Sequence, residues 1–157
     1  MKKLFKLLGL VAVMFAFAGT ANAERVPMPV DKMPSQVQTF LTDYYPGVAV
    51  SDSWAKMMRP TTEPMWYRVN LENGTKLAFD LTGNWYQVNA KKSNTPVSID
   101  LLPNDARKVI SEQYANETIK SVKFKKDCYK ITLSNGQKLQ FDKTYGLKVK
   151  KDKKKNK

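Results

Sequence analysis

Residues 67–80, YRVNLENGTKLAFD, and residues 129–142, YKITLSNGQKLQFD, are two versions of one pattern. In both, apolar and polar residues alternate on either side of Asn-Gly. This dipeptide is typical of the tight turn between antiparallel strands, because both residues accept positive φ. Each stretch therefore predicts a β-hairpin with one apolar face. The side chains expected to face the core are Tyr67, Val69, Leu71, Leu77 and Phe79, and Tyr129, Ile131, Leu133, Leu139 and Phe141.

A helix is predicted before each hairpin. Residues 30–34 (VDKMP) and 99–103 (IDLLP) match, and apolar residues at helical spacing follow each proline. Asp31 and Asp100 are predicted to cap these helices, with the proline in the first turn. The remaining strands are expected at 48–56 and 84–89 in the first copy and at 118–125 and 146–150 in the second.

The predicted fold class is α+β. Two tandem helix-plus-four-strand repeats, about 30–89 and 99–147, are expected to form an antiparallel sheet with both helices packed on one face. The opposite sheet face is then open to solvent. The first copy carries a longer connection between Trp54 and Trp66, and this loop is either a contact surface or a neutral insertion.

The two ends of the chain differ from this domain. Residues 1–23 have three lysines, an apolar run and Ala21-Asn22-Ala23, which together predict a cleaved signal peptide. The run is too short to cross a bilayer and no second run follows, so a periplasmic or secreted protein without a transmembrane segment is expected. The domain then spans 24–147. Residues 148–157 hold seven lysines against one aspartate and predict a disordered tail with weak, salt-sensitive attraction to anionic envelope surfaces.

Composition excludes several kinds of chemistry. The chain has no histidine, which removes the Ser-His-Asp and Cys-His arrangements and the commonest zinc ligand. Cys128 is the single cysteine, so no intramolecular disulfide forms; it is either a small sheet residue or a reactive thiol. A Ser-Lys or paired-carboxylate enzyme stays formally open, but no spacing of these residues marks a site. No enzyme activity, cofactor or metal site is predicted.

The hairpin side chains that alternate away from the core are more aromatic in the first copy. With nearby arginines they predict an aromatic-basic patch on the open sheet face, and Trp, Tyr and Arg dominate binding hot spots. The alternative is that the aromatics pack on the long loop or on one another. Nucleic acid is not expected as a partner, because the positive charge is concentrated in the tail and the predicted location is periplasmic or secreted. The candidate binding residues are Trp54, Arg59, Trp66, Arg68, Trp85 and Tyr86.

The motifs also match the sequence pattern of a known family. A Met-Pro or Leu-Pro opens each helix, Tyr44-Tyr45-Pro46 closes the first, and Gly83-Asn84-Trp85 follows the first hairpin. Over about 30–149 the chain resembles the PepSY-like proteins that are similar to β-lactamase inhibitor proteins, small secreted proteins of Bacteroides-type bacteria. The second copy departs from the pattern, because Tyr145-Gly146-Leu147 lacks the tryptophan.

This resemblance implies tandem helix-plus-sheet modules and binding or inhibition of another protein, with a secreted or envelope peptidase as one candidate target. The leading hypothesis is a secreted or periplasmic binding module that holds an envelope or extracellular protein on the open sheet face. The alternative is a small-ligand or anionic envelope-surface binder with no protein target.

Overall fold

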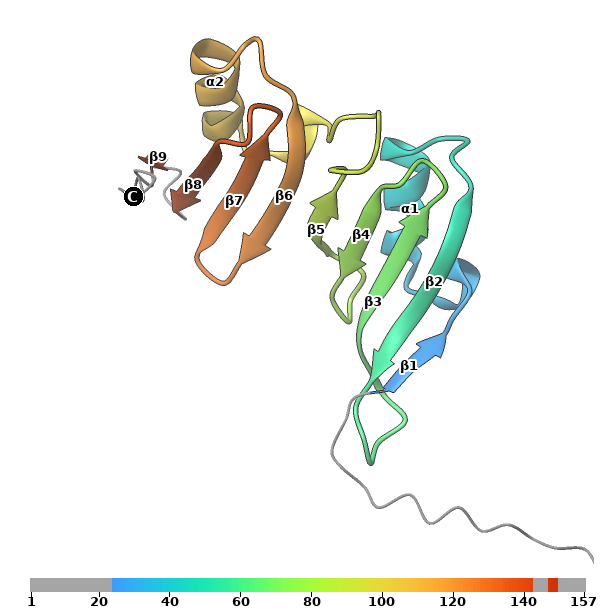
Figure 1. Ribbon diagram of the computed structural model, residues 1–157. Helices are drawn as coiled ribbons and strands as arrows, with labels where there is room; N and C mark the ends of the chain where they lie inside the picture. The colour runs from blue at the N-terminus through green and yellow to red at the C-terminus, as the bar shows by residue number, and fades with distance from the viewer. Residues whose placement is uncertain (1–23, 143–146, 150–157) are drawn as a thin grey trace, which may run out of the picture.

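The computed structural model describes residues 24–142 and 147–149. The predicted signal peptide, 1–23, and residues 143–146 and 150–157 lie outside the described residues. The elements in chain order are β1 (Glu24–Pro27), η1 (Val30–Lys32), α1 (Ser35–Tyr44), β2 (Val50–Met57), β3 (Pro64–Leu71), β4 (Lys76–Phe79), β5 (Trp85–Asn89), η2 (Ile99–Leu101), α2 (Asn104–Gln113), β6 (Ile119–Lys125), β7 (Cys128–Leu133), β8 (Lys138–Asp142) and β9 (Leu147–Val149). The strands form one antiparallel sheet in which their spatial order equals their order in the chain (Figure 1).

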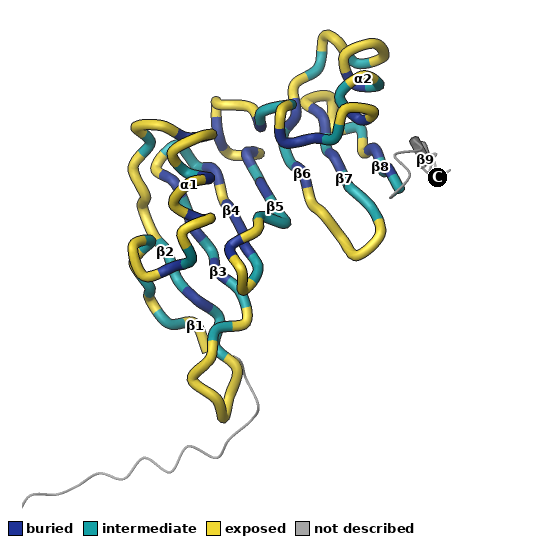
Figure 2. The backbone as a smooth tube through the Cα atoms, turned by 180° about the vertical axis from the view of Figure 1, so that it is seen from behind, coloured by how far each residue is buried: buried dark blue, intermediate teal, exposed yellow. Residues whose placement is uncertain are grey.

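Both α-helices pack on the same face of this sheet (Figures 1 and 2), which confirms the α+β class with an antiparallel sheet. Tyr67, Val69 and Leu71 on β3 are buried, whereas the residues between them are only half-buried. This alternation follows from the pleat, which points successive side chains to opposite faces. The core therefore lies between the sheet and the helices, and no described helix covers the other face (Figure 2).

The first and second halves of the sheet are joined by β5 and β6. Gln87, Val88 and Asn89 pair with Lys123, Val122 and Ser121, respectively. Val88 and Val122 are fully buried on the helix side. Because the pairing is continuous here, the open face runs across both halves.

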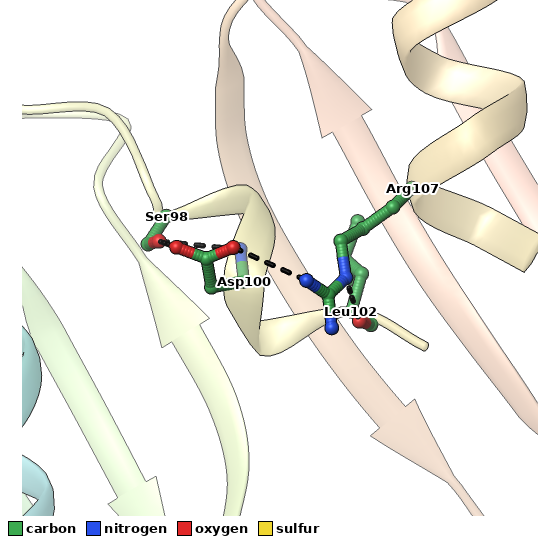
Figure 3. Close-up of polar contacts among 4 residues, drawn as sticks. All are labelled: Ser98, Asp100, Leu102 and Arg107. Carbon is green, nitrogen blue, oxygen red and sulfur yellow. Dashed lines mark hydrogen bonds and ion pairs between the residues drawn. The ribbon is translucent and has the colours of Figure 1, made fainter. Parts of the chain in front are cut away.

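The predicted helix caps are wrong. Asp31 and Asp100 lie in the short 3-10 turns η1 and η2, and the helix N-caps are prolines without a side-chain capping bond. Asp100 instead pairs with Arg107 of α2, whose Nη1 lies 3.2 Å from its Oδ1 (Figure 3). The Asp100 N–H donates to Ser98 Oγ, and Arg107 Nε donates to the Leu102 carbonyl. This network ties η2 to α2.

The hairpin turns are one residue longer than the Asn-Gly pattern predicts. In the first hairpin, Gly74 N–H donates to the Leu71 carbonyl and Leu71 N–H donates to the Thr75 carbonyl, so the loop is residues 72–74. The second hairpin repeats these bonds between Leu133, Gly136 and Gln137. Gly74 and Gly136 have φ near +86° and +84°, as expected for a three-residue loop that ends in a left-handed glycine.

The long connection is shorter than expected. β2 ends at Met57 and β3 begins at Pro64, so only residues 58–63 form the loop. Both Trp54 and Trp66 lie within strands. Arg59–Pro60 is a cis peptide bond in this loop. Strand β1 was not anticipated by the sequence pattern. The segment assigned to the lysine tail begins inside β9, where Lys148 pairs with Gln140.

We predict that the two equivalent hairpin glycines differ in their tolerance of alanine. A Cβ on Gly74 would lie 2.8 Å from the Lys92 carbonyl oxygen, whereas one on Gly136 would meet nothing within 4 Å. Both changes pay the left-handed backbone penalty of about 1 kcal/mol, but only Gly74→Ala adds a backbone clash, for a loss of about 2–3 kcal/mol. Urea unfolding measures the loss of stability in both variants. Equal losses would contradict the close approach of the Lys92 carbonyl to Gly74.

The buried Tyr45 predicts a loss of stability at high pH. Its side chain is 6% exposed, and burial raises its pKa to about 12, above the ordinary value of 10. The folded state therefore holds the phenol proton more tightly, and this stability is complete below pH 10 and is lost as pH rises toward 12. Over that window the native protein should lose about 2 kcal/mol more unfolding free energy than Tyr45→Phe. Urea titrations at stepped pH test this, and parallel curves would refute it.

Candidate functional site

Trp54 of β2 and Trp66 of β3 form a pair on the open face of the sheet. Their ring centroids are 4.9 Å apart with an interplanar angle of 52°. The register explains the contact: Trp54 lies opposite Arg68, so Trp66 is its diagonal neighbour on the same face. Diagonal neighbours are within reach of aromatic side chains. Both rings stay half-buried, so they pack on each other and keep a solvent-facing surface.

Cationic side chains surround this tryptophan pair. Arg68 Cζ lies 5.8 Å from the Trp54 ring centroid and 5.4 Å from that of Trp66. Arg25 of β1 lies 4.7 Å from the Trp54 centroid, and Lys56 Nζ lies 5.7 Å from that of Trp66. Each distance is within the range of cation–π attraction. We call Arg25, Trp54, Lys56, Trp66 and Arg68 the aromatic-basic cluster.

Arg68 is the central member of this cluster. Its Nε is buried and has no hydrogen-bond partner among the described residues. A buried donor without a partner costs free energy, and contact with the two indole rings offsets part of that cost. The guanidinium therefore lies within cation–π range of both Trp54 and Trp66.

A β-bulge in β5 separates Trp85 from Tyr86. Phe79 lies opposite Trp85 while Ala78 lies opposite Gln87, so Tyr86 is the extra residue. Trp85 consequently turns to the helix side, where its ring centroid lies 6.2 Å from that of Phe40. It lines a shallow pocket of about 330 Å³ with Phe40 and Tyr44. The placement of Trp85 on the open face is therefore wrong.

Tyr86 is close enough to Arg68 for the charge of that arginine to act on its phenol. Burial raises the pKa of its phenol above the ordinary value, the positive charge of Arg68 acts to lower it, and Asp80 acts to raise it. Asp80 itself begins the turn before β5. Its burial acts to raise its carboxyl pKa, but hydrogen bonds from Thr82 and Asn84 outweigh this and hold that pKa below the ordinary value.

Arg59 is the second candidate that the structure removes from the cluster. It lies in the loop 58–63 and forms an ion pair with Glu24, the first residue of β1. No described contact joins it to Trp54 or Trp66. Arg59 thus ties the loop to the edge strand.

Sequence reasoning missed Arg25 and Lys56. Arg25 was missed because β1 is only four residues long, which is too short for a clear alternation. Lys56 could have been found, since it is two residues from Trp54 and shares its face of β2. Within residues 24–142 and 147–149, no group of three or more acidic or cysteine side chains is arranged to hold a metal ion.

This geometry defines the class of protein: a small α+β protein whose antiparallel sheet is covered by helices on one face and carries an aromatic-basic cluster on the other. The profile of the family described as "Putative beta-lactamase-inhibitor-like, PepSY-like" matches residues 65–149, more than half of the chain. The chain belongs to this PepSY-like family.

Three solved structures from Bacteroides resemble the chain. A "putative periplasmic protein" of Bacteroides vulgatus is 27% identical, with a TM-score of 0.71 over 80% of this chain and 94% of that one. A "putative calcium-regulated periplasmic protein" of Bacteroides thetaiotaomicron is also 27% identical, with a TM-score of 0.71 over 79% and 94%. A second B. vulgatus protein, described as of unknown function, shares the fold at 22% identity, with a TM-score of 0.69 over 80% and 99%.

These neighbours are described as periplasmic, in agreement with the predicted periplasmic or secreted location. Neither helix in the described part of the chain is long and apolar enough to cross a membrane. No protein of curated function matches the chain significantly.

We predict that Arg68→Gln raises the pKa of Tyr86 further. Removing the positive charge removes an attraction for the phenolate, so ionisation shifts to higher pH. Ultraviolet titration detects the shift, and subtraction of the Tyr86→Phe titration assigns it. Arg107→Gln, remote on α2, serves as the control with the same loss of charge. An unchanged Tyr86 titration in Arg68→Gln would contradict the placement of these two side chains.

Proposed function

We propose that this protein is a periplasmic or secreted binding module that holds a protein partner on the open face of its sheet. The observation that carries this proposal is the aromatic-basic cluster, in which two half-buried tryptophans and Arg68 lie on a face that no described helix covers. Tryptophan and arginine, with tyrosine, are enriched among the hot-spot residues that supply most of the binding energy at interfaces.

The packing within the cluster supports a binding role. Trp54, Trp66 and Arg68 already contact one another in the free protein, so a partner would not have to order them. Immobilising a side chain on binding costs roughly 0.5–1.5 kcal/mol, and a preordered cluster avoids most of that cost. The same contacts also stabilise the sheet, so the structural and binding roles are compatible.

Inhibition of a peptidase or of another envelope protein is the finer form of this proposal. It draws support from the beta-lactamase-inhibitor-like description of the family. A non-enzymatic role is supported by the absence of histidine from the chain and by the engagement of Asp80 with its own turn. Cys128 lies half-buried in β7, opposite Lys125 and Asp142, as a sheet residue would.

The domain assignments belong to the proposal as well. A cleaved signal peptide at 1–23 would make Glu24, the first residue of β1, the mature N-terminus. The two-repeat origin is supported by the order of a 3-10 turn, a helix and four strands in each half, and by the matching hairpin loops. The lysine-rich 148–157 segment would add weak attraction to anionic surfaces.

A second candidate is a small-ligand binder. The pocket beside Trp85, Phe40 and Tyr44 favours it, because aromatic rings can hold an apolar or sugar-like group. This pocket lies on the helix side of the sheet, away from the aromatic-basic cluster. The two candidates therefore predict different tryptophans at the contact.

The test compares two tryptophan variants. The exported protein is immobilised and used to capture proteins from envelope and culture-supernatant fractions at low and moderate salt. Trp54→Ala/Trp66→Ala should lower recovery of a salt-resistant partner at least about tenfold, as expected for loss of a hot spot. Trp85→Ala, a matched change on the helix side, should leave recovery unchanged.

Other outcomes decide between the candidates. Full recovery by Trp54→Ala/Trp66→Ala would refute the proposed contact. Capture of anionic material only, abolished by moderate salt and by deletion of residues 150–157, would favour the envelope-surface alternative. Circular dichroism and urea midpoints establish that each variant is folded.

A further inference from the structure

A hollow lies on the open face of the sheet over strands β5–β8, beyond the aromatic-basic cluster. Its volume is about 280 Å³. Four lysines line it, Lys91 from the segment after β5 and one from each of the next three strands: Lys123, Lys130 and Lys138. No aspartate or glutamate is among its lining residues. We call it the lysine hollow.

The neutral lining of the hollow combines three apolar residues, Val122, Ile131 and Leu139, with five polar ones. Amides and hydroxyls reach it from the same strands, and each can donate a hydrogen bond to an oxygen. These side chains are Gln87, Asn89, Ser121, Thr132 and Gln140. The hollow therefore presents several positive charges together with hydrogen-bond donors, which is the chemistry that binds an anion.

Among the described residues, the lysines of the hollow form no ion pair. The ion pairs formed within residues 24–142 involve Arg59, Arg107 and Lys108 instead. Lys123 and Lys130 are direct cross-strand neighbours on β6 and β7. Like charges directly opposite one another destabilise a sheet. A bound anion would relieve this repulsion.

The lining distinguishes between kinds of anion. It contains no arginine for bidentate contact with a phosphate and no aromatic ring for stacking against a sugar. Three of its lysines are separate point charges on three adjacent strands, and neighbouring strands lie about 4.8 Å apart. Lys138 lies opposite Thr132, two residues along β7 from Lys130, so the charges are spread along the strands as well as across them, as several carboxylates of an extended peptide are.

The hollow continues the row of side chains that contains the tryptophan pair. In the register, Trp54 lies opposite Arg68, then Ala78, Gln87, Lys123 and Lys130 follow across the strands. The five strand intervals span about 24 Å, the reach of roughly seven extended residues. One partner surface can therefore contact both the cluster and the hollow.

We infer that the lysine hollow binds an acidic segment, an extended stretch with several Asp or Glu residues, of the protein partner that contacts the aromatic-basic cluster. This inference rests on the proposed function and adds the chemistry of the partner. The tryptophans supply apolar contact at one end of the row, and the lysines select for negative charge at the other.

The direct test uses fluorescein-labelled octaglutamate and fluorescence anisotropy with the exported protein. Lys123→Gln/Lys130→Gln/Lys138→Gln should weaken binding at least about tenfold, because it removes three of the four charges of the hollow. Lys153→Gln/Lys154→Gln/Lys155→Gln removes the same charge from the C-terminal segment and should change binding less than about twofold. Equal weakening by both variants, or weakening by the C-terminal variant alone, would overturn the inference.

Competitors distinguish other anion sources. Octaglutamine, inorganic phosphate and phosphatidylglycerol vesicles should displace the labelled peptide poorly at matched anion concentration. Stronger displacement by phosphate or by the vesicles would overturn the assignment to an acidic peptide. The hollow variant should keep a urea midpoint equal to or above that of the native protein, because the change removes the Lys123–Lys130 repulsion.

Partner capture separates this inference from the proposed function. A partner whose recovery falls about tenfold with both the tryptophan variant and the hollow variant supports both. A partner lost only with Trp54→Ala/Trp66→Ala overturns the inference and leaves the proposed function standing. If the native protein captures no partner, the proposed function fails. The inferred acidic segment then has no partner protein to belong to, even if the hollow binds octaglutamate.

Discussion

Val88 on β5 pairs with Val122 on β6, and both are buried on the helix side of the sheet. The continuity of the open face across the two halves depends on this pairing. Backbone hydrogen bonds from Ala90 to Lys120 and from Val97 to Ile119 extend the junction. Each half alone would leave β5 or β6 as an unpaired edge strand, which is prone to association. Joining them places Arg68 and Lys130 in one register, so that residues far apart in sequence share one surface.

The bulge in β5 decides which aromatic residues reach this surface. A regular strand with Val88 in the core would also turn Tyr86 inward and leave Trp85 outside. The extra residue breaks this alternation, so Trp85 packs near Phe40 and does not face outward. The buried ring of Phe79, opposite Trp85, meets Phe40 edge-on at 5.4 Å. Packing of α1 against β4 and β5 thus sets the composition of the candidate site on the other face.

The two halves of the sheet carry different chemistry on the open face. Trp54 lies opposite Arg68 on β2 and β3, whereas Lys123 lies opposite Lys130 on β6 and β7. Both pairs face away from the helices, where the core places no demand on volume or polarity. The first half therefore holds an aromatic-basic cluster and the second a lysine-lined hollow, on one sheet. A partner that contacts both the cluster and the hollow must present an apolar surface next to an acidic one.

The sequence by itself determined the class of fold, the two hairpins and nearly all of the buried hairpin face, because period-two alternation is a local property of the chain. It also determined Trp54, Trp66 and Arg68 as outward-facing residues. Only the tertiary structure decided the placement of Asp31 and Asp100 in η1 and η2 instead of at the helix N-caps, the three-residue hairpin loops, the side taken by Trp85 and the ion pair that withdraws Arg59. It likewise brought Arg25 of β1 to Trp54. These features depend on contacts between segments distant in sequence, and local periodicity carries no information about such contacts.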